Sequence, residues 1–172
     1  YRPGIRYTGV DVSAPLIAEA RASHPDADFL TGDCASGLPL PDRVAGVVQA
    51  LGWLHWEERR QAVLTELWRL TDRYLFFDIR LSLDAGGASA GQQRIAFVGP
   101  WDGKTTVPYM VVAWPEVAGL LVHLRPKAIL GYGYWGKPAD TVVGVPNEAC
   151  FATFVLERCE ESRPGPTPAV CL

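Results

Sequence analysis

Two aspartates follow short apolar segments of the sequence, at positions that suit contacts with a nucleoside. Asp11 ends the segment YTGVD, and Asp33 follows the segment FLTG. In open α/β sheets, ligands bind beyond the carboxyl ends of the strands. A carboxylate at the first strand end can accept hydrogen bonds from both hydroxyls of a ribose. Asp33 and the backbone N–H of Cys34 could read the edge of an adenine at the second, so the pattern predicts a nucleotide-like ligand.

Further candidate side chains follow two later apolar segments. The stretch VVQALGWLHW ends in a loop of small and apolar residues, including Ala50 and Leu51, which suits contact with a cofactor and its transferred group. His55 in this loop is a candidate acid, base or acceptor-orienting group, with packing against the next helix as the alternative. Asp78 and Arg80 of FFDIR face the same side of a strand, because side chains alternate along it. One of them could orient an acceptor, or the two could form an internal ion pair.

A glycine pattern near the end of the chain raises a second nucleotide hypothesis. Residues 131–136, GYGYWG, spell G-x-G-x-x-G, which cradles a dinucleotide phosphate when it lies between a strand and a helix. The segment KAIL predicts the strand, but KPADTVVGVP follows with prolines and β-branched residues where the helix should begin. We therefore reject the phosphate site and predict a strand whose glycines permit a bulge or a close backbone approach.

The elements that must position these residues alternate along the chain. Apolar runs predict strands, and apolar residues at three-to-four spacing predict helices. Alternating strands and helices indicate an α/β fold with a mainly parallel, Rossmann-like sheet. The last two strands lack a connecting helix, so we expect an antiparallel β-hairpin there. The expected strands cover residues 5–13, 26–34, 44–52, 73–81, 127–135 and 148–158, and the expected helices cover residues 13–24, 57–71 and 114–126.

Composition restricts the class of protein. The chain has 172 residues, 48% hydrophobic and 20% charged, which predicts one globular domain over residues 1–158 and a flexible, proline-rich tail over residues 159–172. The formal charge of −3 supplies no basic field for a nucleic-acid partner. No apolar run reaches the roughly 18 residues of a membrane span, so we expect a cytoplasmic protein with no membrane partner. The four cysteines lack zinc-ligand spacing, and we predict no metal site; the oligomeric state stays open.

The order of these segments resembles the class I S-adenosylmethionine-dependent methyltransferases over residues 5–157. The matching stretches are YTGVDVS, FLTGDC followed by GLPLPD, VVQALGWLHWEE, RYLFFDIR and the terminal strand pair. The resemblance implies a fold, a cofactor, S-adenosyl-L-methionine, and methyl transfer to an acceptor, which we expect to be a small molecule. It also implies a cofactor site formed by Asp11, Val12, Asp33, Cys34, Ala50 and Leu51.

The resemblance also implies where the acceptor binds. Methyltransferases of this class often build the acceptor pocket from the insertion after the fifth strand. In this chain the insertion covers residues 84–106 and the adjoining segment up to Tyr109, and we expect residues 84–106 to be a long loop or a partly ordered insertion. Trp101 and Tyr109 are candidates there. Tyr134 and Trp135 are candidates for the pocket rim, beside Arg80, and His55 and Asp78 are the catalytic candidates.

One part of the family pattern has no counterpart in this sequence. The first strand and its glycine-rich turn, which hold the methionine end of the cofactor, would precede YTGVDVS, where only six residues stand. We therefore expect this central strand to be missing and the chain to be the downstream portion of a longer methyltransferase. A gap or poor pairing between residues 7–12 and 46–51 would support that hypothesis. A well-paired central strand drawn from elsewhere in the chain would contradict it.

Two other functions remain open at this point. A methyltransferase-like domain without the glycine-rich turn could be a non-catalytic binding domain. An NAD(P)-dependent oxidoreductase would use Asp11 on a nucleotide ribose in the same way, although TGDC and the terminal hairpin disfavour it.

Overall fold

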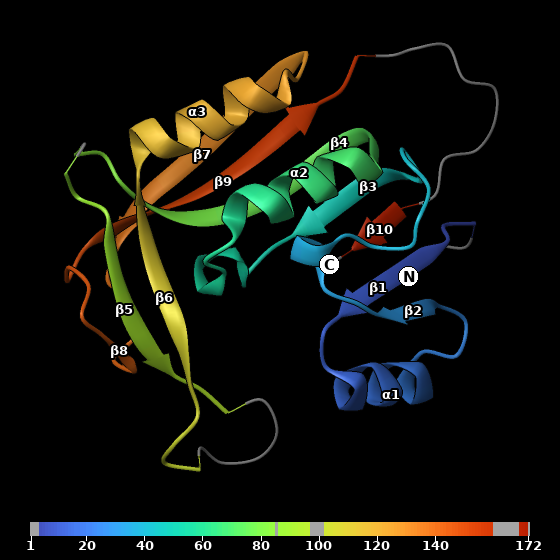
Figure 1. The fold of residues 1–172 in the computed structure, drawn as a ribbon, viewed down its shortest axis with the longest axis horizontal. Helices are drawn as coiled ribbons and strands as arrows, with labels where there is room; N and C mark the ends of the chain where they lie inside the picture. The colour runs from blue at the N-terminus through green and yellow to red at the C-terminus, as the bar shows by residue number, and fades with distance from the viewer. Residues whose placement is uncertain (1–3, 85, 97–101, 160–168, 172) are drawn as a thin grey trace.

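The fold is a single mixed sheet with helices packed against it (Figure 1). The computed structural model describes residues 4–84, 86–96, 102–159 and 169–171. Its strands follow the order β2-β1-β10-β3-β4-β6-β5-β8, while β9 pairs with β4 and β7 pairs with β9. The elements are β1 (Tyr7–Asp11), α1 (Ala14–Ser23), β2 (Asp28–Thr31), η1 (Cys34–Ser36), β3 (Ala45–Ala50), η2 (Leu54–Trp56), α2 (Arg60–Leu70), β4 (Thr71–Ser82), β5 (Ser89–Arg94), β6 (Thr106–Ala113), α3 (Trp114–Leu124), β7 (Ala128–Gly136), β8 (Val142–Val143), β9 (Ala149–Glu157) and β10 (Ala169–Cys171).

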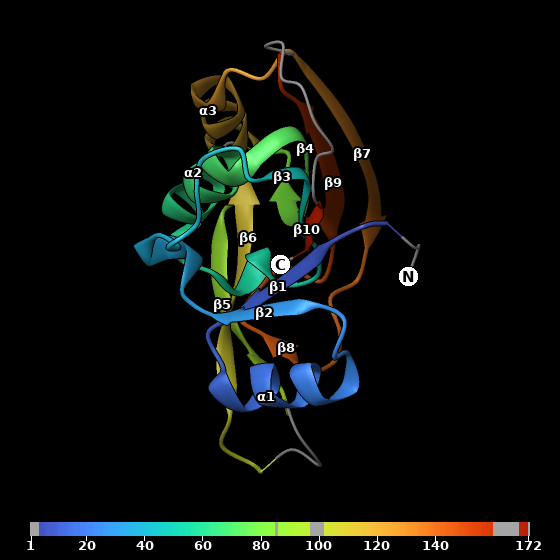
Figure 2. The same ribbon diagram turned by 90° about the vertical axis from the view of Figure 1, so that its right-hand side faces the viewer.

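The three predicted α-helices are confirmed, although α2 begins at Arg60, three residues after its predicted start. Ser13 caps α1, with its Oγ accepting the Leu16 N–H at 3.4 Å, and a proline occupies the first turn. Pro115 likewise occupies the first turn of α3, and Arg125 ends that helix in a left-handed conformation at φ 51°. Figure 2 shows α2 and α3 on the same side of the sheet, away from β7.

The parallel core and the terminal antiparallel pair are confirmed. β1 pairs in parallel with β2, and β3 pairs in parallel with β4. β9 runs antiparallel to both β4 and β7. The inner face of β4 carries Leu75, Phe77 and Ile79, which are fully buried in the main hydrophobic core beneath α2 and α3. Because parallel strands end at the same edge, the loops after β1, β2 and β3 converge there.

The centre of the sheet differs from the prediction. β10 lies between β1 and β3 and runs parallel to both, with Ala169 opposite Tyr7 on one side and Val47 on the other. The gap that the downstream-portion hypothesis predicts is therefore not found in the described residues, and the predicted flexible tail is wrong for residues 169–171. The physical reason is that unpaired N–H and C=O groups on two facing strand edges offer a pairing site that a short extended segment can fill.

The insertion after β4 also differs from the expected loop. Its described residues include β5, which pairs antiparallel with β6 from Ser89–Val111 to Arg94–Thr106. β8 adds to the other edge of β5 through Gln92 and Gln93. Residues 97–101 lie outside the described part of the chain. The insertion therefore forms a β-hairpin that extends the sheet (Figure 1). Its strand β6 contacts η2.

GYGYWG forms the last six of the nine residues of β7, and a helix does not follow it. The predicted close backbone approach is confirmed: a Cβ at Gly133 would lie 2.7 Å from the Cys150 Sγ, and one at Gly131 would lie 3.0 Å from the Phe154 ring. The strand pairs with β9 in an unbroken register. Among the described residues, no helix is both long enough and apolar enough to cross a membrane.

Candidate functional site

A cavity of about 570 Å³ opens at the carboxyl ends of the parallel strands. Its walls come from residues 10–13 at the end of β1, residues 32–34 after β2, and Trp53, Trp56 and Glu57 after β3. The volume is within the usual range for small-molecule sites, which bury most of a ligand between apolar walls and a few placed polar groups. Asp11, Val12, Asp33 and Cys34, all predicted from the sequence, lie together in this cavity.

Asp11 is held in a defined turn between β1 and α1. Its Oδ1 accepts the Ser13 N–H at 2.7 Å, and its backbone oxygen accepts the Gly32 N–H at 2.9 Å. The second contact ties the end of β1 to the end of β2. The carboxylate therefore lies exposed at the cavity wall in a preformed position, as a group that receives two ribose hydroxyls requires.

The Asp33 carboxylate accepts more hydrogen bonds than are needed to cap a turn. The Ala35 N–H donates to its Oδ1 at 3.0 Å, and the Ser36 hydroxyl donates to its Oδ2 at 2.6 Å. Arg59 adds two contacts, Nη1 to Oδ2 at 3.1 Å and Nη2 to Oδ1 at 3.4 Å. The Ser36 hydroxyl, together with the Ala35 N–H and Arg59, holds the pKa of the Asp33 carboxyl below its usual range. The Asp33 carboxyl is therefore ionised at neutral pH.

Cys34 is part of the cavity wall. Its side chain is buried, and burial raises the pKa of the thiol to about 12, with the Glu66 and Asp33 charges acting in the same direction. The side chain therefore stays a neutral thiol, and a thiolate nucleophile is excluded at this position.

The residues at the end of β3, which were expected to contact the cofactor, do not line the cavity. Ala50 is fully buried, Leu51 is half exposed, and neither belongs to the described wall of the cavity. Trp53 and Trp56 line the cavity instead. The sequence signal for these two tryptophans was the WLHW stretch directly after a buried strand. The aromatic side chains of this stretch were equally consistent with packing against α2.

His55 lies outside the cavity, in a closed aromatic pocket. It is 4% exposed and makes edge-to-face contacts with Trp56 and Tyr109, each with ring centroids 5.0 Å apart. Its Nδ1 is buried without a hydrogen-bond partner among the described residues. Burial lowers the pKa of His55 to about 4, and the Arg80 guanidinium acts in the same direction. The imidazole is therefore neutral at physiological pH.

The hairpin of the insertion covers His55. The Trp56 Nε1 donates to the Gln93 Oε1 at 2.9 Å, and the Gln93 Nε2 donates to the Thr141 hydroxyl at 3.3 Å. These contacts join η2 to β5 and to the loop before β8. Tyr109 on β6 is itself buried against His55, so this predicted acceptor residue packs against a predicted catalytic residue.

Asp78 and Arg80 form the internal ion pair that the sequence left open as an alternative. The Arg80 Nη1 donates to the Asp78 Oδ2 at 2.7 Å, and the Asp78 Oδ1 accepts the Gly52 N–H. Asp78 thereby fixes Gly52, whose φ of 85° favours glycine. The Arg80 guanidinium lies 4.2 Å from the Phe151 ring centroid, and Phe151 stacks on Tyr134. This row of side chains follows one face of the sheet toward β7.

The remaining predicted acceptor residues do not converge on the cavity. Trp135 is exposed on β7, and Trp101 lies outside the described residues. Sequence reasoning missed Arg59, which lines the neighbouring groove and reaches Asp33 from there, because an exposed arginine at the start of a helix carries no local signal of a partner 26 positions earlier.

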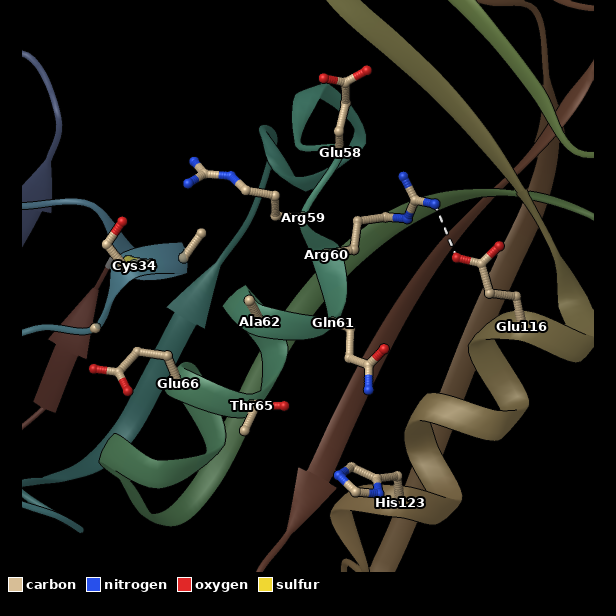
Figure 3. Close-up of a pocket in the computed structure, with 13 residues that line it drawn as sticks. Cys34, Glu58, Arg59, Arg60, Gln61, Ala62, Thr65, Glu66, Glu116 and His123 are labelled. Carbon is tan, nitrogen blue, oxygen red and sulfur yellow. Dashed lines mark hydrogen bonds and ion pairs between the residues drawn. The ribbon is translucent and has the colours of Figure 1, made fainter.

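A second, more open groove of about 840 Å³ lies between α2 and α3 (Figure 3). Arg60 crosses it toward Glu116, with Nη2 donating to Oε1 at 2.9 Å. Figure 3 shows Arg59 directed away from Arg60, toward the side of Cys34. Cys34 lines both hollows, so η1 and the start of α2 form the wall between them.

Comparison with known proteins agrees with this geometry. Residues 1–73 match the methyltransferase domain family. A stretch of 65 residues is 32% identical to trans-aconitate 2-methyltransferase of Paracidovorax citrulli (strain AAC00-1). That match covers 38% of this chain and 25% of that protein.

Solved structures extend the likeness to the whole fold. A SAM-dependent methyltransferase from Methanosarcina mazei has a TM-score of 0.63 at 14% identity, over 90% of this chain and 82% of that one. The 1,6-didemethyltoxoflavin-N1-methyltransferase of Burkholderia thailandensis, with 1,6-didemethyltoxoflavin and S-adenosylhomocysteine bound, has a TM-score of 0.55 at 13% identity, over 90% of this chain and 62% of that one.

These findings confirm the resemblance. The fold is that of S-adenosylmethionine-dependent methyltransferases of known structure, and residues 1–73 match the methyltransferase domain family.

Proposed function

We propose that the protein transfers a methyl group from S-adenosylmethionine to a small-molecule acceptor. The observation that carries this proposal is that two aspartates from adjacent strand ends, Asp11 and Asp33, line one cavity of suitable size. The family match covers the residues that form this part of the cavity. The bound small molecule in the Burkholderia thailandensis relative supports the acceptor class.

The residues of the cavity fit the adenosine part of the cofactor. Asp11 would accept the ribose hydroxyls, and Asp33 with the Cys34 N–H would read the adenine edge. Val12 and the two tryptophans would supply apolar contact with the base. The cofactor supplies a methyl group on a sulfonium, which an acceptor nucleophile takes as the carbon–sulfur bond breaks, and S-adenosylhomocysteine remains.

On the acceptor side, the chain would act mainly by positioning. Aligning two reactants can supply on the order of 7–11 kcal/mol of the barrier. Asp78 fixes the backbone after β3 through Gly52, so we assign it a positioning role. His55 is neutral and buried, and it could take a proton only from an acceptor that enters beneath the hairpin. Arg80, Tyr134 and Trp135 remain the proposed acceptor contacts, with Trp101 and Tyr109 as the proposed contacts from the insertion.

Calorimetry with S-adenosylhomocysteine tests the cofactor assignment. Asp11→Asn removes a charged acceptor of two hydroxyls, and we expect affinity to fall about 10- to 100-fold, since hydrogen bonds to charged groups contribute about 1.5–3 kcal/mol. Asp28→Asn is the matched control, because Asp28 begins β2 on the exposed side, away from the cavity. Equal losses in both variants, or none in either, would contradict the assignment.

Binding and methyl-transfer measurements distinguish the proposed function from its two alternatives. A non-catalytic binding domain would bind S-adenosylhomocysteine but methylate no acceptor in a screen with labelled S-adenosylmethionine. An NAD(P)-dependent oxidoreductase would bind NAD with an affinity that depends on Asp11. Binding of S-adenosylhomocysteine without NAD binding, followed by transfer of the label, supports the proposed function. We also propose that the protein is cytoplasmic, which cell fractionation would test.

A further inference from the structure

The Arg59 guanidinium is hydrogen-bonded to the Asp33 carboxylate, which is the group expected to bind the adenine edge. Its guanidinium makes a two-pronged contact with Asp33, one nitrogen to each carboxylate oxygen, at 3.1 and 3.4 Å. The Ala35 N–H and the Ser36 hydroxyl bond the same two oxygens. Each oxygen of Asp33 therefore accepts two hydrogen bonds.

This arrangement leaves no acceptor position for a ligand. An ionised carboxylate offers about four lone-pair sites, and four donors fill them here. Ala35 and Ser36 belong to the turn that Asp33 caps, so their contacts are part of the local fold. Arg59 lies 26 positions further along the chain and supplies the other two donors, which can leave without unfolding that turn.

Glu57 gives the Arg59 guanidinium a second partner. The Glu57 Oε1 accepts the Arg59 Nε at 3.3 Å, and the Glu57 Oε2 accepts Nη2 at 3.5 Å. The Arg59 side chain is 57% exposed, so rotation away from Asp33 meets little steric resistance. Glu57 lines the cavity and Arg59 lines the groove next to it, so a guanidinium that releases Asp33 can stay on Glu57 at the boundary between the two.

We propose that Arg59 is a specificity-determining residue of the cofactor cavity, whose guanidinium competes with the exocyclic amine of adenine for the Asp33 carboxylate. This inference rests on the proposed function. The amine at position 6 of adenine is a donor and needs a free acceptor, so adenine binding requires Arg59 to move. Hypoxanthine carries an oxygen at that position, which can instead accept a hydrogen bond from Arg59. Arg59 therefore weakens binding of adenine nucleosides and reduces discrimination against 6-oxo bases.

Binding of two nucleosides tests the proposal. S-adenosylhomocysteine and its 6-oxo counterpart, S-inosylhomocysteine, differ only at position 6 of the base. Their affinities for wild type, Arg59→Gln and Arg60→Gln are measured by calorimetry. Arg60→Gln is the matched control, because it removes the same charge one residue away but points toward Glu116 (Figure 3). Urea unfolding of each variant checks that the fold is retained.

We expect Arg59→Gln to bind S-adenosylhomocysteine about two- to fivefold more tightly than wild type, the range for an exposed ion pair. The preference for the adenine over the hypoxanthine compound should rise further, because the 6-oxo group loses its donor. Arg60→Gln should match wild type in both respects. A merely structural Arg59 would change the two affinities in parallel.

Unchanged or weaker adenine binding in Arg59→Gln, or an unchanged base preference, would overturn the role of Arg59 while leaving the proposed function standing. Failure of all three folded proteins to bind S-adenosylhomocysteine would overturn both.

Discussion

The buried imidazole of His55 predicts a specific pH dependence of stability. Burial lowers the pKa of His55 to about 4 from its ordinary value of 6.5, with the Arg80 charge acting in the same direction. The unfolded chain therefore binds a proton at a higher pH than the native protein does. The stabilisation is fully present above about pH 6.5, is lost as the pH falls toward about 4, and reaches its limit below that, where both states are protonated.

The magnitude follows from the two pKa values. One pKa unit corresponds to about 1.4 kcal/mol, so the full shift corresponds to roughly 3 kcal/mol. Between about pH 7 and about pH 5, where carboxylates contribute less, His55 alone should lower the free energy of unfolding by about 2 kcal/mol. The other two histidines, His24 and His123, are exposed.

Urea unfolding, followed by far-ultraviolet circular dichroism at a series of pH values, measures this effect. His55→Gln keeps a polar side chain but removes the titrating group, and we expect its stability to be flatter over this pH range. His123→Gln is the matched control and should keep the wild-type slope. Parallel curves for wild type and His55→Gln would refute the reasoning, since they would mean that His55 does not titrate differently in the two states.

Three further changes test the packing around the site. Glu66→Ala removes the acceptor of the Arg69 guanidinium and of a buried backbone N–H, and should lower the free energy of unfolding by about 2 kcal/mol in urea; no change would contradict the contacts. Gly91→Ala brings a Cβ into overlap with the Val143 backbone oxygen, so we expect a loss of about 2 kcal/mol and faster amide exchange in β5, and full protection would argue against this pairing. A chain ending at residue 158 lacks β10 and should unfold at lower urea, whereas an unchanged midpoint would exclude a structural role for β10.

Much of the fold could be predicted because its signals are local. A run of apolar residues that ends at Asp11 or at Gly32 specifies both a buried strand and its exposed end. Ser13 and Pro115 specify helix starts by their own side-chain chemistry. Since parallel strands present their carboxyl ends at one edge, the predicted positions of Asp11 and Asp33 were enough to place both in one cavity.

The elements that were missed depend on distant partners. β5, SAGQQR, has few residues that favour strands, and its conformation follows from pairing with β6. β10 is three residues long and pairs with strands more than 120 positions earlier. The contact between Arg59 and Asp33 likewise depends on how α2 meets η1. A sequence pattern carries no signal for such contacts, because the three-dimensional arrangement decides them.

A crystal structure of the protein with S-adenosylhomocysteine would test the central claim most directly. The account predicts that both ribose hydroxyls lie within hydrogen-bond distance of the Asp11 carboxylate, and that the adenine lies beside Asp33 in the cavity of about 570 Å³. Binding in the groove between α2 and α3, or a ribose turned away from Asp11 at saturating ligand, would contradict it.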